Sequence, residues 1–172
     1  MRPSERLGWT ADVVAPSPSD RVLEVGCGHG VLVSLIAARL TTGLVVGIDR
    51  SARMIAAATR RNRPAIEAGR IRLMAAALTE ADLEGQPFDV VVSFNVRAFW
   101  TSPAPEWDVV DRVLARGGRA VVAWSLMGAE MQAPVEEAVG RLAGARGLVA
   151  AGLYRGRTTP TESVALELRR GT

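Results

Sequence analysis

A glycine-rich turn between an apolar strand and a helix constrains the fold of this chain most strongly. Residues 21–30 read Arg-Val-Leu-Glu-Val-Gly-Cys-Gly-His-Gly, and an apolar run at 31–40 follows directly. Glycines leave room for a ligand to approach the backbone, and the first turn of the helix offers N–H donors to it. Asp49 ends the next apolar run, where a carboxylate can accept hydrogen bonds from ribose hydroxyls. The segment therefore predicts a nucleotide-like ligand.

The spacing of the glycines separates the classes of nucleotide-binding protein. A dinucleotide fingerprint, G-x-G-x-x-G, requires its third glycine at position 31, which is Val31; the third glycine here is Gly30. Glu24 lies inside the preceding strand, and a carboxylate is unusual in a buried parallel strand unless a group pairs with it. The pattern argues against a dinucleotide site.

With these residues the chain resembles the class I S-adenosylmethionine-dependent methyltransferases. Their first motif is (V/L)-(L/V)-(E/D)-(V/L/I)-G-x-G-x-G, and residues 22–30 fit it at every defined position. Residues 88–93 are similar to the fourth strand of that family, and residues 112–119 to its turn before the fifth strand. The resemblance covers almost the whole chain, without an inserted cap, as in a small stand-alone member. It implies S-adenosylmethionine as the cofactor and methyl transfer as the reaction.

Strands and helices alternate along the chain with short connections, as in a doubly wound α/β protein. We expect strands at 21–26, 44–49, 70–74, 88–94, 119–125, 147–154 and 162–169. Helices are expected at 3–14, 30–41, 51–62, 105–115 and 130–143. Pro64 should end the third of these helices, and Gly117-Gly118 should form a turn before the fifth strand.

The order of these elements predicts a seven-stranded, mostly parallel sheet with an antiparallel last strand and helices on both faces, the Rossmann-like methyltransferase fold. We expect a single domain overall. Residues 1–20 would form a short helix and linker, and residues 21–172 the S-adenosylmethionine-binding domain.

The resemblance also implies which residues contact the cofactor. They are Glu24, Gly26, Cys27, Gly28, Gly30, Asp49, Arg50, Met54, Ala76, Ala77, Ser93, Phe94 and Asn95. Glu24 would act at the amino-acid end of the cofactor, directly or by ordering the glycine loop, and Asp49 would hold the ribose. Other interpretations remain open: Glu24 as a strand-end charge, Asp49 as the cap of the next helix, and Met54 as a core residue rather than an adenine contact.

The chain departs from the family after its third strand. The family commonly has Gly-Asp-Ala there, with a carboxylate that binds the adenine amino group, whereas this chain has Ala75-Ala76-Ala77. The backbone of Ala76 and Ala77, or Glu80 or Asp82 folding back, would have to replace that contact. One missing hydrogen bond costs about 0.5–1.5 kcal/mol.

The acceptor is expected beyond the fourth strand, at the carboxyl edge of the sheet. Asn95, Arg97 and Trp100 are the candidate acceptor contacts; Trp100 instead packing the following helix is an equal alternative. Asn95, Arg97 and His29 are weak catalytic candidates, and no clear general base exists. None is required when the acceptor is already nucleophilic. Trp9 is a candidate lid over the cofactor.

The composition limits the partners. All 21 basic residues are arginines, and the net charge is only +3, so the high pI of 10.3 is a poor sign of nucleic-acid binding. Cys27 is the only cysteine, which excludes an internal disulfide and a multi-cysteine metal site, and we expect no metal. No apolar run is long enough for a membrane span, and no apolar signal core follows the first six residues.

We therefore expect a cytoplasmic protein, monomer or homodimer, that methylates a small molecule and binds neither nucleic acid nor membrane. Two rival interpretations remain. The arginine content raises the first, an RNA methyltransferase. The Ala75–Ala77 departure raises the second, a non-catalytic protein that keeps the fold and has lost the cofactor.

Overall fold

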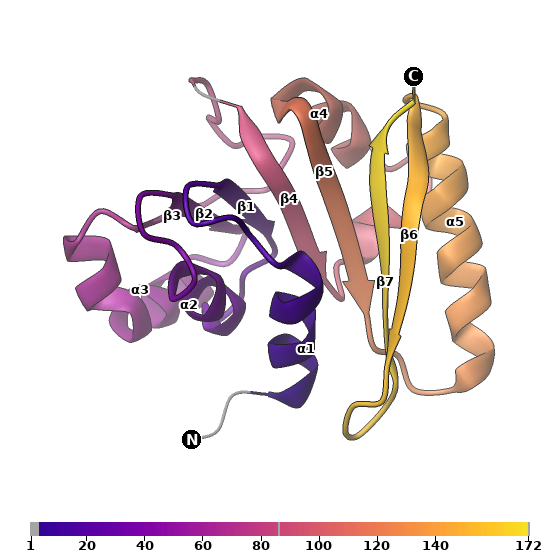
Figure 1. The fold of residues 1–172 in the computed structure, drawn as a ribbon, viewed down its shortest axis with the longest axis horizontal. Helices are drawn as coiled ribbons and strands as arrows, with labels where there is room; N and C mark the ends of the chain where they lie inside the picture. Colours follow the sequence, from indigo (N-terminus) through magenta and orange to yellow (C-terminus); the bar gives the residue numbers. More distant parts are fainter. Residues whose placement is uncertain (1–3, 86, 172) are drawn as a thin grey trace.

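The computed structural model describes residues 4–85 and 87–171, which contain one seven-stranded sheet in the order β3-β2-β1-β4-β5-β7-β6 (Figure 1). The strands are β1 (Arg21–Val25), β2 (Leu44–Asp49), β3 (Ile71–Ala75), β4 (Phe88–Phe94), β5 (Leu114–Trp124), β6 (Leu148–Gly156) and β7 (Ser163–Arg170). The first five pair in parallel, and β7 runs antiparallel between β5 and β6. The predicted fold class is confirmed.

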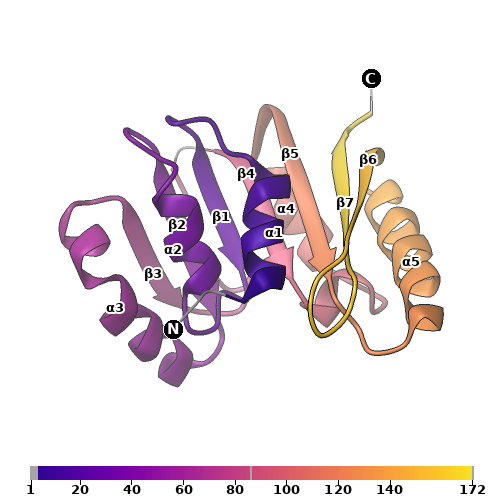
Figure 2. The ribbon, with the colours of Figure 1, turned by 60° about the horizontal axis from the view of Figure 1, so that its bottom comes forward.

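Helices cover both faces of the sheet (Figure 2). They are α1 (Glu5–Val14), α2 (Val31–Ala37), α3 (Ala52–Glu67), α4 (Glu106–Val113) and α5 (Gln132–Gly144), with short 3₁₀ helices η1 (Arg97–Phe99) and η2 (Ala129–Met131). Buried side chains of α1 and α2 share one apolar cluster with the sheet, and α3 packs at its margin. Those of α4 and α5 share the other. No helix in this part of the chain is long and apolar enough to cross a membrane.

The strand order places a crevice at the centre of the sheet. From β1 the chain proceeds outward to β2 and β3, and then returns to the other side of β1 with β4. The connections of β1 and β4 therefore leave in opposite directions at their carboxyl ends, which is where open α/β sheets bind ligands. Both strands are almost entirely buried, because helices cover both of their faces.

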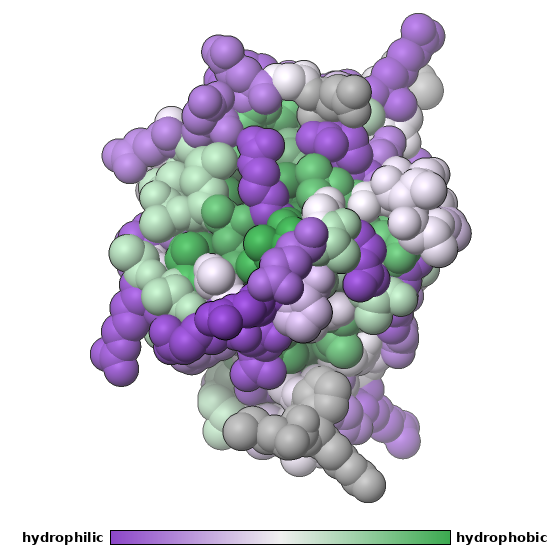
Figure 3. All heavy atoms as spheres, turned by 90° about the vertical axis from the view of Figure 1, so that its left-hand side faces the viewer, coloured by the Kyte–Doolittle hydropathy of each residue, from purple (hydrophilic) through white to green (hydrophobic). Residues whose placement is uncertain are grey.

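One edge of the sheet carries charged side chains. β3 is an edge strand, and Arg72 is exposed in its middle. Figure 3 looks onto this side of the molecule and shows hydrophilic side chains projecting around a smaller area of apolar residues. A charged side chain on an edge strand opposes pairing with a second sheet.

The prediction that α3 ends at residue 62 is wrong. The helix continues through Pro64 to Glu67. Arg60, whose carbonyl would accept the hydrogen bond that Pro64 cannot donate, is exposed to water. The last turn also packs Ala65 and Ile66 against the apolar cluster of α1 and α2. Burial of these side chains offsets the cost of the proline.

Two other boundaries differ from the prediction. α2 ends at Ala37 rather than 41, because the Pro18 carbonyl accepts hydrogen bonds from the N–H groups of 41–43 and draws the chain away. β5 already begins at Leu114, and the two glycines lie inside it, where the pairing with β4 is irregular. The predicted first helix began at residue 3, which lies outside the described residues; α1 is described from Glu5.

Candidate functional site

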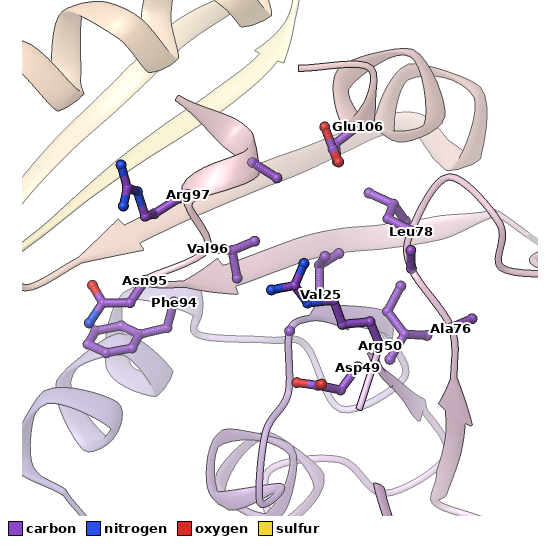
Figure 4. Close-up of a pocket in the computed structure, with 14 residues that line it drawn as sticks. Val25, Asp49, Arg50, Ala76, Leu78, Phe94, Asn95, Val96, Arg97 and Glu106 are labelled. Carbon is purple, nitrogen blue, oxygen red and sulfur yellow. The ribbon is translucent and has the colours of Figure 1, made fainter. Parts of the chain in front are cut away.

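A pocket of about 490 Å³ opens at the carboxyl ends of the central strands (Figure 4). Its lining comes from the ends of β1, β2 and β4, from the segment after β3, and from η1 and α4. The lining residues are Val25, Gly26, Ile48, Asp49, Arg50, Ala76, Ala77, Leu78, Phe94, Asn95, Val96, Arg97, Ala98 and Glu106. Eight of them are among the residues that the sequence predicted for the site.

The three glycines of the first turn all adopt left-handed backbone conformations, with φ between +52° and +74°. A Cβ on Gly26 would lie 2.6 Å from Val96 Cγ2, and one on Gly30 would lie 2.8 Å from the Cβ of Ala58. A Cβ on Gly28 would meet nothing within 4 Å. Gly26 and Gly30 therefore allow close packing inside the protein, whereas the open side of Gly28 leaves space for a ligand to approach the backbone.

The carboxylate of Asp49 connects the glycine turn to the start of α3. Its Oδ2 accepts a hydrogen bond of 2.9 Å from the N–H of Gly28, and its Oδ1 accepts one of 2.9 Å from the N–H of Ser51. Each oxygen retains a lone pair for a further donor. Ser51 caps α3 by accepting from the N–H of Met54, and Met54 does not line the pocket.

Glu24 lies beneath the pocket rather than in its lining. The side chain is 3% exposed, and its Oε2 has no hydrogen-bond partner among the described residues. Burial raises the pKa of Glu24 well above its usual range; the backbone N–H of Val33 opposes this, and the Asp49 charge adds to it. Burial, with the charges of Glu24 and Asp49, also raises the pKa of the Cys27 thiol, so this cysteine is not an activated nucleophile.

The end of the pocket near Ala76 and Leu78 has apolar walls. The backbone N–H of Ala76, a predicted contact for the adenine, instead donates to the carbonyl of Asp49 at 3.0 Å. Glu80 and Asp82 line a separate hollow and do not reach this pocket. The carboxylate here belongs to Glu106, on the first turn of α4.

The opposite end of the pocket is formed by Phe94, Asn95 and Arg97 (Figure 4). Asn95 has a left-handed conformation with φ of 56°, and its Oδ1 accepts a hydrogen bond of 2.8 Å from the N–H of Ser125. It therefore links the ends of β4 and β5 as well as lining the pocket. Ser93, buried at 1% exposure, lies one residue before this end of β4 and outside the lining.

Several predicted residues lie away from the pocket. Trp100 packs against Trp124 at the end of β5, with ring centroids 6.4 Å apart, and is not part of the lining. His29 is exposed on the glycine turn and is not part of the lining. The indole of Trp9 lies against Gly156 at the end of β6 and also does not line the pocket.

Six lining residues were not predicted from the sequence. Val25, Ile48, Leu78, Val96 and Ala98 lie at or just beyond strand ends, where the predicted topology could have indicated them. Glu106 had no such signal, because an acidic residue at a helix start is expected for the helix alone. Glu106 lines the pocket only because α4 packs beside it, and the sequence does not show that packing.

The arrangement suits a nucleoside with a charged tail. A flat base fits apolar walls, a sugar fits the carboxylate of Asp49, and a polar tail fits the open backbone around Gly28. Each of these features comes from a different element, so the fold alone brings them together.

Comparisons with known proteins agree with this geometry. A family model described as a methyltransferase domain matches residues 22–118, more than half of the chain. A trans-aconitate 2-methyltransferase from Streptomyces avermitilis is 36% identical over 85 residues, 49% of this chain and 31% of that protein. An uncharacterised methyltransferase, YdaC of Bacillus subtilis, is 28% identical over 114 residues, 66% of this chain and 61% of that protein. The chain thus spans about a third to three fifths of the length of these relatives.

Among solved structures, the magnesium protoporphyrin IX methyltransferase of Synechocystis PCC 6803 with bound S-adenosylmethionine has the same fold. Its TM-score is 0.73 at 21% identity, over 95% of this chain and 79% of that one. The match extends beyond the residues of the family model into the second half of the sheet. The cofactor is S-adenosylmethionine, and the chain belongs to the methyltransferase domain family, in its class I S-adenosylmethionine-dependent branch.

Proposed function

We propose that this protein transfers the methyl group of S-adenosylmethionine to a small-molecule acceptor by in-line displacement. The observation that carries the proposal is the pocket where β1 and β4 diverge: Asp49 lines it, and the carboxylate of Asp49 also accepts a hydrogen bond from the open backbone of Gly28. A carboxylate can accept hydrogen bonds from ribose hydroxyls, and a backbone without a side chain leaves room for an amino-acid tail. The pocket volume of about 490 Å³ is in the range of small-molecule sites.

Each part of the cofactor has a proposed set of contacts. Asp49 would accept from the ribose hydroxyls through its remaining lone pairs. The base would lie between Ile48 and Leu78, and the methionine end would extend along Gly28 toward Asn95. Glu24, Cys27, Gly30 and Ser93 would support this surface from below, and Met54 would hold the start of α3. We also propose residues 21–172 as the cofactor-binding domain.

The reaction asks little covalent chemistry of the protein. The bound cofactor supplies a methyl carbon on a positively charged sulfur, so the carbon–sulfur bond breaks as the bond to the acceptor forms. The residues of the pocket hold the acceptor in line and exclude water, and such positioning accounts for about 7–11 kcal/mol in favourable cases. The proposal assigns no general base, because an acceptor that is already nucleophilic needs none.

Arg97 supports an anionic acceptor. Its guanidinium is exposed at the end of the pocket that Asn95 also lines, and it forms no ion pair among the described residues. A free cation there attracts a carboxylate or phosphate toward the methyl group. The relatives named for small-molecule acceptors agree with a small acceptor in this protein as well.

Binding and transfer assays test this proposal together. Calorimetry with S-adenosylhomocysteine should give a Kd far below millimolar for the wild type and weaker binding by about 10-fold or more for Asp49→Asn. Asp82→Asn, whose carboxylate lies in the separate hollow, is the matched control and should bind like the wild type. Transfer of labelled methyl to small organic acids, and not to RNA, is the expected result. Millimolar or weaker cofactor affinity, or transfer to RNA alone, would contradict the proposal.

A further inference from the structure

We propose that Glu106 recognises the amino group of the adenine base, replacing the carboxylate that is missing after β3. The inference rests on the proposed placement of the cofactor in this pocket. It assigns a binding residue on α4, an element that lies on the other side of the base from Ala76 and Ala77.

Glu106 occupies the end of the pocket where the base should lie. The walls there are Ala76, Ala77 and Leu78, which offer a flat base apolar contact. In Figure 4 the carboxylate of Glu106 projects toward the pocket beside Leu78, at the end far from Asn95. Because Asp49 lies between the two ends, a nucleoside with its sugar on Asp49 and its tail toward Asn95 directs its base to Glu106.

The carboxylate of Glu106 is available for a ligand. Among the residues that the structure describes, it takes part in no ion pair and accepts no side-chain or backbone hydrogen bond, although the residue is half-buried. Adenine has one exocyclic donor, its 6-amino group, and a carboxylate is a strong acceptor for it. The Ala76 N–H, which donates to the Asp49 carbonyl, is a donor and cannot bind the amino group.

The neighbours of Glu106 hold it in place. The next residue, Trp107, is fully buried, and its Nε1 donates a hydrogen bond of 3.1 Å to the carbonyl of Phe99. On the outer side, Arg146 forms a two-pronged ion pair with Asp108, at 3.0 and 3.2 Å. With Trp107 turned to the core and Asp108 to Arg146, Glu106 remains on the side of α4 that faces the pocket. These contacts fix the backbone of Glu106 and the side of the helix on which its carboxylate lies.

The test measures recognition of the amino group itself. Calorimetry compares S-adenosylhomocysteine with its 6-desamino analogue, in which hydrogen replaces the amino group, for wild type, Glu106→Ala and Glu106→Gln. The wild type should prefer the amino compound by about 10-fold, and Glu106→Ala should lose both this preference and a similar factor in affinity. Glu106→Gln, whose amide oxygen still accepts, should keep part of the preference. Asp82→Ala is the control and should keep all of it.

The outcomes separate the two proposals. A Glu106→Ala variant that still prefers the amino compound by the full factor overturns the assignment of Glu106 and leaves the cofactor site intact. A wild type that binds neither compound contradicts the placement of the cofactor and, with it, this inference. Thermal unfolding followed by circular dichroism checks that each variant is folded. If Glu106→Ala does not fold, the preference that Glu106→Gln shows for the amino compound decides the test.

Discussion

At the scale of single residues, the carboxylate of Asp49 is both a structural and a binding group. It holds the N–H of Gly28 on one oxygen and that of Ser51 on the other, and it still lines the pocket. The sequence analysis treated the ribose and helix-cap roles as alternatives. The cap of α3 is Ser51, whereas Asp49 joins the glycine turn to Ser51 and keeps lone pairs for the proposed ribose contact.

The buried Glu24 predicts a specific pH dependence. Because burial raises its pKa in the folded state above the ordinary value of 4.5, the folded protein holds a proton that the unfolded chain releases. The free energy of unfolding attributable to Glu24 therefore falls as pH rises above about 4.5. Glu24→Gln, which never ionises, should match the wild type near pH 4 and become relatively more stable by up to about 1.4 kcal/mol per pH unit.

Urea unfolding of both proteins between pH 4 and pH 8 measures this difference. Glu67→Gln, at the exposed end of α3, is the matched control and should show no such trend. A wild type and Glu24→Gln variant whose stabilities stay parallel across this range would show that Glu24 is ionised in the folded protein.

Alanine substitutions at Gly28 and Gly69 distinguish the loss of stability caused by a positive φ from the loss of affinity caused by blocking a ligand. Gly28 and Gly69 both have positive φ, and a Cβ on either would meet nothing within 4 Å. Substituting alanine at either position should therefore cost about 1–2 kcal/mol of stability. Only Gly28→Ala should also weaken cofactor binding, because only Gly28 faces the proposed path of the amino-acid tail. Calorimetry on both variants checks this, and equal affinities would show that the tail lies elsewhere.

At the scale of elements, α3 shows how tertiary packing overrides a local signal. A proline inside a helix costs about 3 kcal/mol, and the sequence alone therefore indicates an end before Pro64. The local sequence does not show that Ala65 and Ile66 pack against the apolar cluster of α1 and α2. The predicted start of β5 was wrong for the same reason. Gly117 and Gly118 indicate a turn locally, but Leu114, which precedes them, pairs with Phe88 of β4, so the glycines lie inside the strand.

Replacing Pro64 tests this explanation. Pro64→Ala allows an N–H to bond the Arg60 carbonyl and removes the ring, while it makes the unfolded chain more flexible by up to about 1 kcal/mol. The net effect should be a gain of about 2 kcal/mol in the free energy of unfolding, measured by urea. Pro105→Ala, at the start of α4 where proline is tolerated, should bring no gain. A Pro64→Ala variant no more stable than the wild type would mean that the helix absorbs the proline without cost.

At the scale of the whole molecule, the sheet could be predicted because its strands are continuous apolar runs and its first turn follows a specific motif. The residues that form the two ends of the pocket could not be predicted in this way. Which residues meet there depends on how η1 and α4 return over the sheet, and so Glu106 entered the site while Trp100 and Glu80 did not. The strand-end residues Asp49, Phe94 and Asn95 line one pocket, and their meeting there follows from the topology alone.

Part of the arginine charge of the molecule is neutralised within the protein. Six arginines form ion pairs with carboxylates, including Arg146 with Asp108 and Arg170 with Asp111. Charges neutralised in this way contribute little to a field that attracts nucleic acid. Together with the net charge of only +3, this pairing makes the pI of 10.3 a poor sign of nucleic-acid binding.

A crystal structure of the complex with S-adenosylhomocysteine tests the central claim most directly, because it locates every part of the ligand against the central crevice. The account predicts ribose hydroxyls within hydrogen-bond distance of the Asp49 carboxylate, the base between Ile48 and Leu78, and the sulfur near Asn95. A ligand bound outside this pocket, or one whose ribose does not contact Asp49, would contradict the account.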